Sequence, residues 1–484
     1  SDRSDCPTKT EPQMPHVIRK KRLNVEFDGP ESEVLALQRR LERFCYECLL
    51  PVMEVALNEQ ATEDEHILLE EVVIDVGTIP LDQLEAELSQ AVQEGVQQAL
   101  REELQSPRGD SRRRNRLQAM TEVFLHFLEQ GSLPWWFQLP AGKELEQVLL
   151  ECWLDENLPY GAAVIALEEV LIPLQKEQAR RRLILQFSER FRSLLLPIIA
   201  PQVGVRVAAV LESLAGVALP TAAMALLRDN VWDNGLAAAG NHVGVTEHDL
   251  ISRAWLGLPA SVKRLPEVAA ALERHWPGAA GARKSDAPIK QIEDATHRHG
   301  EEPAAGHAAK IKAASQAETM QEGIYLENGG VVLLHPYLPQ LFEALEIISG
   351  NRILAPERGV AVLHYLATGS TEPPEYQVAL QKILCSIPLH APIARKVELS
   401  DLDIEMCDYL LNALLGHWGA LRNSSVNGLR GAFLMRPAKL TLRENEEWLL
   451  QVEKNSCDIL LDQLPFSISM VKLPWMEKLL WVQW

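Results

Sequence analysis

The sequence predicts a mainly α, multidomain protein with α+β modules at its two ends. Three observations support this fold class. Apolar residues recur at spacings of three and four over much of the chain, prolines interrupt the middle region, and alternating or β-branched runs lie near the two ends. No transmembrane helix is expected, because no apolar run reaches the roughly 18–20 residues that such a helix needs.

Composition narrows the class of protein further. The chain has 484 residues, of which 47% are hydrophobic and 24% charged, as in globular proteins. Its 47 basic and 67 acidic residues give a net charge of −20, which argues against a nucleic-acid-binding surface over the whole protein. Seven scattered cysteines are typical of reduced thiols in a cytosol, and the polar residues 1–15 lack the apolar core of a secretory signal. We therefore expect a cytoplasmic protein.

The order of these patterns divides the chain into six segments. Two are expected to be linkers, because one is short, polar and basic and the other contains no Leu, no Val and no aromatic residue. In chain order the segments are a disordered N-terminus (1–15), a β-α-β-α module (16–105), a basic linker (106–116), a helical middle region (117–277), a flexible Ala- and Gly-rich linker (278–321) and a C-terminal α+β module (322–484).

In the N-terminal module, alternation predicts the strands and helical spacing predicts the helices. A first strand is predicted over residues 17–27, where apolar and polar residues alternate up to Phe27. The β-branched run at residues 67–76 predicts a second strand. A helix should follow each strand, and the apolar stripe over residues 81–104 predicts the clearest amphipathic helix of the chain.

The middle region should consist of short helices. Nine prolines between residues 134 and 266 predict a string of short elements rather than one rod, because proline ends or kinks a helix. The C-terminal module should open with a hairpin, or with a strand followed by a turn, at residues 325–334, with the turn at Asn328, Gly329 and Gly330. After it, helices are predicted at residues 337–348, 359–368, 377–385 and 402–418, and strands at residues 448–452 and 467–471.

Cys45 and Cys48 have the CxxC spacing of a redox motif or of half a zinc site. A tetrahedral zinc site needs a second pair of ligands, and the sequence contains neither a second CxxC nor an HxxxH. Both cysteines lie on the apolar stripe of a predicted helix. We interpret them as reduced core residues and expect no bound metal.

No enzymatic signature occurs in the sequence, which has no GxSxG, HExxH or Walker A motif. A catalytic Cys–His dyad in the C-terminal module would have to be assembled by the tertiary fold. We interpret the residues concerned as structural and expect a non-enzymatic protein without a cofactor. They are His335, His364, His390, His417, Cys385 and Cys407.

Basic clusters and tryptophans remain as candidates for protein binding. The arginine runs at residues 112–116 and 180–182 are interpreted as solvated faces, with docking to acidic protein surfaces as the alternative. The eleven tryptophans are interpreted as core anchors, with an interface role as the alternative for some of them. The candidate partner-binding residues are Arg112, Arg113, Arg114, Trp135, Trp136, Trp475, Trp481 and Trp484.

The two ends of the chain resemble one protein family. At the N-terminal end the resemblance rests on RKKRLNVEF (19–27), LALQ (35–38) and IDVGTI (74–79). Over residues 322–484 it rests on longer motifs, among them ENGG (327–330), LLHPYLP (333–339), LHYLATG (363–369), NSSVNGLR (423–430) and KLPWM (472–476). These motifs resemble those of the contractile injection system tape measure protein family. The middle region carries no such motif.

The resemblance implies a non-enzymatic structural or assembly component of a phage-tail-like particle, in which a contracting sheath drives an inner tube through a target membrane. It implies that the chain sets the inner-tube length by its own extent. The implied partners are subunits of the inner tube, the baseplate or spike and the cap, with effector cargo as a further partner. The net charge favours no nucleic-acid partner, and the lack of a long apolar run favours no stable membrane insertion. The oligomeric state is left open.

The resemblance also implies a location: the cytoplasm of the producing bacterium, followed by incorporation in the particle lumen. One physical constraint keeps a second function open. A helical middle region of roughly 160 residues would span at most about 240 Å, and prolines interrupt it. The alternative is a cytosolic assembly chaperone or cargo-loading adaptor for the same particle.

Overall fold

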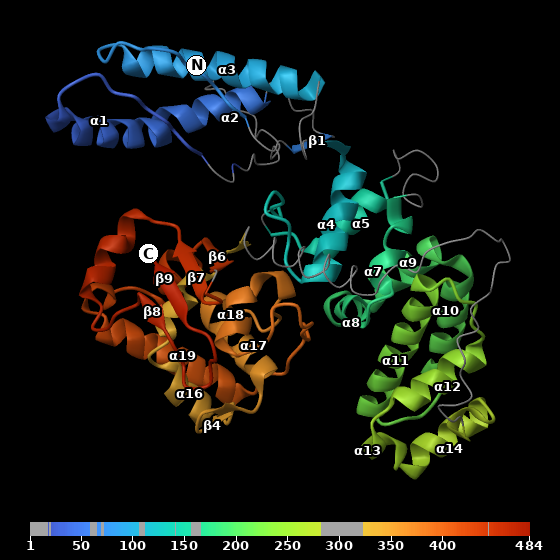
Figure 1. The fold of residues 1–484 in the computed structure, drawn as a ribbon. Helices are drawn as coiled ribbons and strands as arrows, with labels where there is room; N and C mark the ends of the chain where they lie inside the picture. The colour runs from blue at the N-terminus through green and yellow to red at the C-terminus, as the bar shows by residue number, and fades with distance from the viewer. Residues whose placement is uncertain are drawn as a thin grey trace, which may run out of the picture. The chain divides into compact units, whose positions relative to one another are not determined.

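A computed structural model describes residues 18, 21–58, 65–68, 72–105, 112–140, 142–155, 166–281, 323–443 and 445–484. The chain forms two compact units: Ser1–Val123 with Trp135–Ala166, and Phe124–Pro134 with Leu167–Trp484. Helices predominate and a small sheet lies near the C-terminus (Figure 1), which confirms the predicted fold class. No helix within the described ranges is long and apolar enough to cross a membrane.

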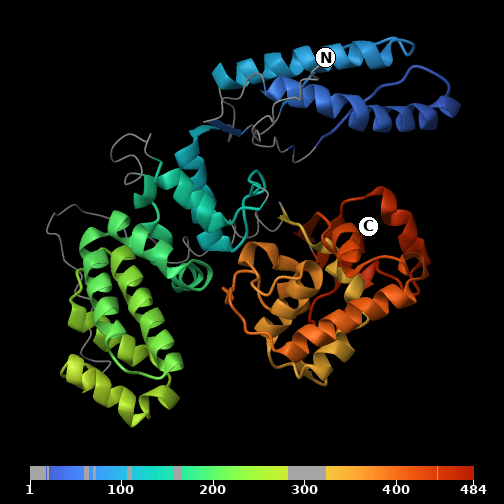
Figure 2. The same ribbon diagram turned by 180° about the vertical axis from the view of Figure 1, so that it is seen from behind.

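The first unit begins with a pair of helical runs that lie along each other (Figures 1 and 2). Their shared core contains Leu41 and Phe44 from the first run and Leu88, Val92 and Val96 from the second. The elements of this unit are α1 (Glu31–Phe44), the π-helical turn η1 (Cys45–Leu49), α2 (Leu50–Asn58), β1 (Glu65–Leu68), α3 (Leu84–Gln105), β2 (Arg112–Asn115), the first part of α4 (Arg116–Gln130) and α5 (Leu145–Trp153).

The helical run of α1 and α2 continues past Pro51, although proline usually kinks or ends a helix. A π-helical turn makes this possible: the Leu50 amide bonds to the Cys45 carbonyl, one residue further back than in an α-helix. Wider turns of this kind relieve the clash of a proline ring with the preceding turn. Cys45 is buried in this turn and Cys48 is half-buried, as expected for core cysteines.

The first predicted strand, residues 17–27, is wrong over its described part. Residues 21–28 form no strand, and Leu23 and Val25 are 42% and 51% exposed. Backbone N–H and C=O groups need partners to form a strand. Within the described part of this unit, β1 and β2 pair with each other and not with this segment.

The second predicted strand is wrong at residues 72–76, although β1 overlaps its first two residues. Ile74 and Val76 pack against the helical core while Val73 is 75% exposed. The alternation in the sequence therefore reflects a segment that packs one face on helices without joining a sheet.

The basic linker predicted at residues 106–116 is also wrong over its described part. Arg112, Arg113 and Arg114 belong to β2, which pairs antiparallel with β1. Asn115 then starts α4 by reciprocal capping: its Oδ1 accepts a hydrogen bond from the Gln118 amide at 2.8 Å, and Gln118 Oε1 accepts one from the Asn115 amide at 3.2 Å.

The second unit contains the proline-punctuated helices that the sequence predicts. Pro201 and Pro266 occupy the first turns of α10 and α14, and Pro220 and Pro259 immediately precede α11 and α13. The helices are α7 (Leu171–Leu174), α8 (Glu177–Gln186), α9 (Glu189–Ile199), α10 (Pro201–Ala215), α11 (Thr221–Gly240), α12 (Glu247–Gly257), α13 (Ala260–Lys263) and α14 (Pro266–His275), followed by the 3₁₀ turn η2 (Ala279–Gly281).

Two predicted segments lie largely outside the described residues. These are the N-terminus at residues 1–15 and the linker at residues 278–321, of which residues 282–321 are not described. The first residues of that linker are folded, because Ala279 in η2 is fully buried.

Residues 323–484 confirm the four predicted helices in α16, α17, α18 and α19, and the strand at residues 448–452 in β7. Only the end of the strand predicted at residues 467–471 forms, as β8. The elements are β3 (Ile324–Leu326), η4 (Gly329–Leu334), α16 (Leu338–Ala344), β4 (Ile348–Ser349), β5 (Arg352–Ile353), α17 (Pro356–Thr368), η5 (Glu375–Gln377), α18 (Ala379–Leu384), α19 (Asp401–His417), η6 (Gly419–Leu421), α20 (Val426–Leu429), η7 (Arg430–Leu434), β6 (Ala438–Leu442), β7 (Trp448–Val452), η8 (Ser456–Gln463), β8 (Met470–Val471) and β9 (Leu480–Gln483).

The main sheet has the strand order β3-β6-β7-β9-β8. Its pairs are antiparallel except β7 with β9, which are parallel with Trp448 opposite Leu480. Alternate residues of β7 and β9, such as Leu450 and Val482, are buried in one core with side chains from α16, α17 and α19. This core gives the C-terminal half of the second unit its own apolar interior.

Of the two alternatives predicted for residues 325–334, the hairpin is wrong because its second strand does not form, and the strand followed by a turn agrees with β3. Residues 329–334 form the 3₁₀ helix η4, in which Val331, Val332, Leu333 and Leu334 are all fully buried. A half-buried strand would expose every second side chain, whereas a helix wedged between other elements can bury all of them. β3 therefore pairs with β6.

Gly330 makes this packing possible, and its substitution tests the account. A Cβ at Gly330 would lie 1.6 Å from the Phe433 carbonyl oxygen, so the two backbones would have to separate. We expect Gly330→Ala to lower the free energy of unfolding by about 3 kcal/mol. Denaturant unfolding measures this. The matched control is Gly416→Ala in α19, where a Cβ meets nothing within 4 Å; it should be neutral or stabilising, and equal effects of the two substitutions would contradict the account.

Candidate partner-binding site

The loop between α4 and α5 carries two of the predicted binding residues. Trp135 and Trp136 are both half-buried there, and the next residue, Phe137, is buried. The rings of Trp136 and Phe137 meet edge to face with centroids 6.2 Å apart. The contact packs the Trp136 ring against a buried residue, and both tryptophans stay partly accessible. Such partly accessible aromatic residues are common at protein interfaces.

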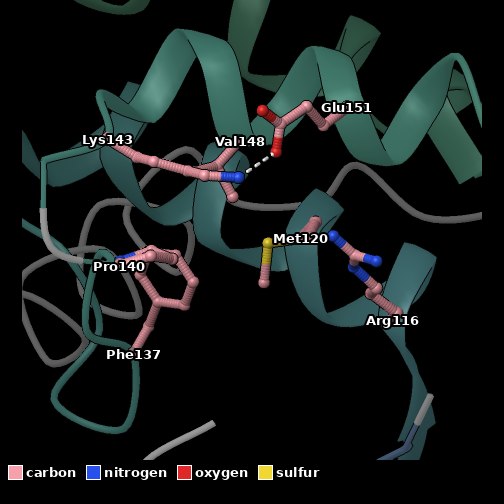
Figure 3. A pocket seen from close by; sticks show the side chains of 7 residues that line it. All are labelled: Arg116, Met120, Phe137, Pro140, Lys143, Val148 and Glu151. Atoms are coloured by element: carbon pink, nitrogen blue, oxygen red, sulfur yellow. Dashed lines mark hydrogen bonds and ion pairs between the residues drawn. The ribbon is translucent and has the colours of Figure 1, made fainter. Parts of the chain in front are cut away.

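A small pocket lies between this loop, α4 and α5 (Figure 3). Its apolar lining comes from Met120, Phe137, Pro140 and Val148, and its volume is about 50 Å³. The charged part of its lining is Arg116, Lys143 and Glu151. The pocket can therefore receive a small apolar side chain next to charged groups.

The rim of the pocket is ordered by one ion pair. Lys143 Nζ donates to a Glu151 carboxylate oxygen at 2.6 Å (Figure 3), and Gln147 Nε2 donates to the other oxygen at 2.9 Å. The hydrogen bond from Lys143 lowers the pKa of Glu151. Arg116 is the further cation of the lining, so the rim carries one positive charge more than negative charge. An acidic partner is favoured here by charge.

Both predicted N-terminal groups are close in sequence to residues that line this pocket. Arg112, Arg113 and Arg114 lie on β2 immediately before Arg116, and Trp135 and Trp136 immediately precede Phe137. The pocket residues Lys143 and Glu151 were missed by the sequence analysis. Their spacing of eight residues gives no recognisable motif.

The three C-terminal candidates differ from one another. Trp475 is only 7% exposed, stacks on Phe342 with centroids 5.4 Å apart, and donates from Nε1 to the Leu384 carbonyl at 2.8 Å. It is a core anchor. Trp481 and Trp484 are half-buried.

Each of these two half-buried tryptophans has a guanidinium over its ring. Arg443 lies 5.7 Å from the Trp481 centroid and Arg436 lies 5.6 Å from the Trp484 centroid. Trp481 Nε1 also donates to Glu447 at 2.7 Å. Cations at this distance orient an aromatic ring, so both rings are held in place while part of their surface stays accessible.

Two buried cysteines of the C-terminal half, Cys385 and Cys407, are not activated as nucleophiles. Burial raises the pKa of the Cys407 thiol to about 12 and raises that of Cys385 as well, so both are protonated and weakly nucleophilic at neutral pH. His335 Nδ1 lies 2.9 Å from the Val332 carbonyl oxygen of the preceding turn. Over the described ranges, no group of three or more His, Cys, Asp or Glu side chains could hold a metal ion.

His364 in α17 has a consequence for stability. It is 1% exposed, and burial lowers its pKa to about 4. In the unfolded chain this histidine has an ordinary pKa near 6.5, so between pH 6.5 and pH 4 it is protonated in the unfolded chain and neutral in the folded chain. The free energy of unfolding is therefore unaffected by this histidine above about pH 6.5 and decreases as the pH drops from 6.5 towards 4. At pH 5 the decrease is about 2 kcal/mol.

We expect His364→Leu to remove this acid sensitivity. Unfolding free energies at pH 7.5 and pH 5 should differ less in His364→Leu than in the unsubstituted protein, by about 2 kcal/mol. The matched control is Cys385→Ala, which also removes a buried group but one that is uncharged at both pH values. The account fails if His364→Leu loses as much stability at pH 5 as the unsubstituted protein.

Comparison with known proteins adds the family. A family model for the contractile injection system tape measure protein matches residues 15–484. No match was found among curated proteins or solved structures. The matched range includes the middle region, where the sequence shows none of the family motifs that its ends carry. The chain therefore belongs to the contractile injection system tape measure protein family.

Proposed function

We propose that this protein sets the inner-tube length of a contractile injection system and binds tube, baseplate or spike, or cap subunits while doing so. The observation that carries the proposal is the family match over residues 15–484. Membership implies association with other particle subunits. The role is structural and non-enzymatic. The protein acts from the cytoplasm of the producing bacterium and is then incorporated in the particle lumen.

The lengths of the helices favour a specific form of this mechanism and keep a second function in view. The longest described α-helix, α3, has 22 residues and spans about 33 Å, and the continuous helical run from α1 through η1 to α2 is only about 9 Å longer. No single described helix can therefore measure a tube many times that length. If the chain is a ruler that sets the tube length by its own extent, several of its elements must be arranged end to end to span that length. The same short helices favour the alternative function, a cytosolic assembly chaperone or cargo-loading adaptor, because an adaptor works by recognition and not by extent.

The surfaces proposed for partner binding contain half-buried tryptophans, an exposed arginine or a run of arginines. In the first unit they are the pocket with Arg116, the adjoining Trp135 and Trp136, and the strand with Arg112, Arg113 and Arg114. In the second unit they are Trp481 and Trp484. Trp475 is set aside because its ring and its Nε1 are both used in the core.

Tube length separates the ruler from the adaptor. We expect insertion of three helical heptads after residue 300 to lengthen the inner tube by about 30 Å, at 1.5 Å per residue. An equally long Gly/Ser insertion at the same place is the matched control, and its effect should be smaller because a flexible chain does not fix a distance. Electron microscopy measures tube length, and mass spectrometry of purified particles shows whether the chain is present.

The adaptor function would be supported by the opposite result. Tubes of unchanged length with the helical insertion, in particles that still assemble, would exclude the ruler. Absence of the chain from the finished particles would place its action before completion.

The aromatic loop can be tested separately. We expect the double substitution Trp135→Ala and Trp136→Ala to weaken binding to purified inner-tube or baseplate subunits by at least about tenfold, because interface tryptophans carry a large share of binding energy. Trp276→Ala is the matched control, since Trp276 is also half-buried but lies at the end of α14. Unchanged binding to every subunit would remove the loop from the proposed surface.

A further inference from the structure

A buried charge cluster joins two parts of the second unit that are far apart in sequence. Arg182 on α8, Glu375 on η5 and Lys382 on α18 are each at most 1% exposed. Arg182 Nε donates to Glu375 Oε2 at 3.0 Å, and Lys382 Nζ donates to Glu375 Oε1 at 2.6 Å. One carboxylate therefore receives two cations.

Helix α8 makes further polar contacts with the same region. Arg182 Nη2 donates to the His390 carbonyl at 2.7 Å. Gln186, one turn later, donates from Nε2 to the Ile393 carbonyl and accepts from the Glu375 amide through Oε1, both at 2.9 Å. Two side chains of α8 thus bind three separate backbone groups and one carboxylate within residues 375–393.

The apolar core of residues 324–484 contains no described residue of α8, the helix that makes these polar contacts. Every described member of the core that contains β7 and β9 lies between residues 324 and 484. The contacts from α4 and α8 to residues 375–395 include the cluster, a backbone hydrogen bond from Arg395 to Leu185, and an edge-to-face pair of Phe127 and Tyr376 with centroids 6.0 Å apart. Residues 323–484 form a body with a separate core, attached mainly through polar groups.

The charges are distributed unequally between the two sides. Glu375 and Lys382 both belong to residues 323–484 and neutralise each other, and Lys382 also donates to the carbonyls of Leu389 and Ala391. Arg182 is the extra cation and comes from the helical part of the unit. Gly131, at the end of α4, leaves room for this arrangement: a Cβ there would lie 2.4 Å from Glu375 Oε1.

Such an interface differs energetically from an apolar one. Apolar surfaces that separate must be exposed to water at a cost proportional to their area. Buried ions lose hydration on docking and regain it on separation, so a buried ion pair contributes specificity more than net stability. The polar groups of this cluster can be hydrated on both sides once the surfaces part.

We propose that Arg182, Gln186 and Glu375 form a reversible latch, through which residues 323–484 dock on the helical part of the unit and can leave it with both parts still folded. The partner for this surface of α8 is thus the C-terminal body of the same chain. The proposal is independent of whether the protein measures tube length. It assigns to the chain a closed state and an open state that differ at one polar interface.

The run Arg180-Arg181-Arg182 supplies a test with internal controls. Arg180 pairs with Asp233 at 2.8 Å within the helical part, Arg181 is exposed, and Arg182 enters the latch. A protease site is introduced after residue 300 of the full chain, the chain is cleaved, and association of the two fragments is measured by analytical size exclusion and native mass spectrometry. The unsubstituted fragments should stay together.

We expect Arg182→Met to weaken association of the fragments by about tenfold to 100-fold, while Arg181→Met and Arg180→Met leave it unchanged. The uncut Arg182→Met chain should have a larger radius of gyration by small-angle scattering and unchanged near-ultraviolet circular dichroism. Association as tight as in the unsubstituted protein would overturn the proposal.

A second variant guards against a folding defect, because Arg182 Nη1 also donates to the Leu128 carbonyl within the helical part. Gln186→Met removes two hydrogen bonds of the latch and changes no charge. It should weaken association by about tenfold. If Gln186→Met leaves association unchanged, or releases the fragments only by unfolding one of them, the latch is not a docking surface.

Discussion

Burial of the apolar residues between Leu326 and Val482 in one core is the constraint on which the C-terminal body depends. It explains why residues 329–334 coil into a 3₁₀ helix, since a strand there would expose half of an entirely apolar run. It also explains the glycines before that run, because the helix must approach the Phe433 backbone closely to close the core. The core fixes Trp475 in turn, with its ring on Phe342 and its Nε1 on Leu384.

Local patterns predicted the helices well and the strands less well. The helices α16, α17, α18 and α19 and the strand at residues 448–452 follow from local apolar patterns. The alternation that ends at Phe27 has the same local signature as a strand, but pairing depends on a neighbour that no local pattern specifies. Proline shows the same limit: Pro51 lies inside a helical run because a π-helical turn gives its ring room.

The aromatic and basic residues of the candidate site could be predicted from the sequence, whereas the pocket that they adjoin and its ion pair could not. Adjacent tryptophans and an arginine run are visible in a sequence, and residues that follow each of them along the chain line the pocket. The pair of Lys143 and Glu151 depends on how the loop meets α5, which no spacing rule encodes. In the run Arg180-Arg181-Arg182, three identical residues have three different surroundings, because the helix turns each one towards a different neighbour. Composition alone cannot distinguish a solvated arginine from a buried one.

The place of β9 in the sheet affects how the protein is made. This strand lies between β7 and β8, although it follows both in the sequence, and among the described strands β8 pairs with β9 alone. The sheet cannot therefore assemble in the order in which its strands leave the ribosome. Until residues 480–483 have been synthesised, β7 keeps one edge unpaired, and a chain interrupted earlier exposes that edge to chaperones and proteases. The complete five-stranded sheet therefore forms only after residues 480–483 have been added, so closure of the C-terminal body is a late step of folding.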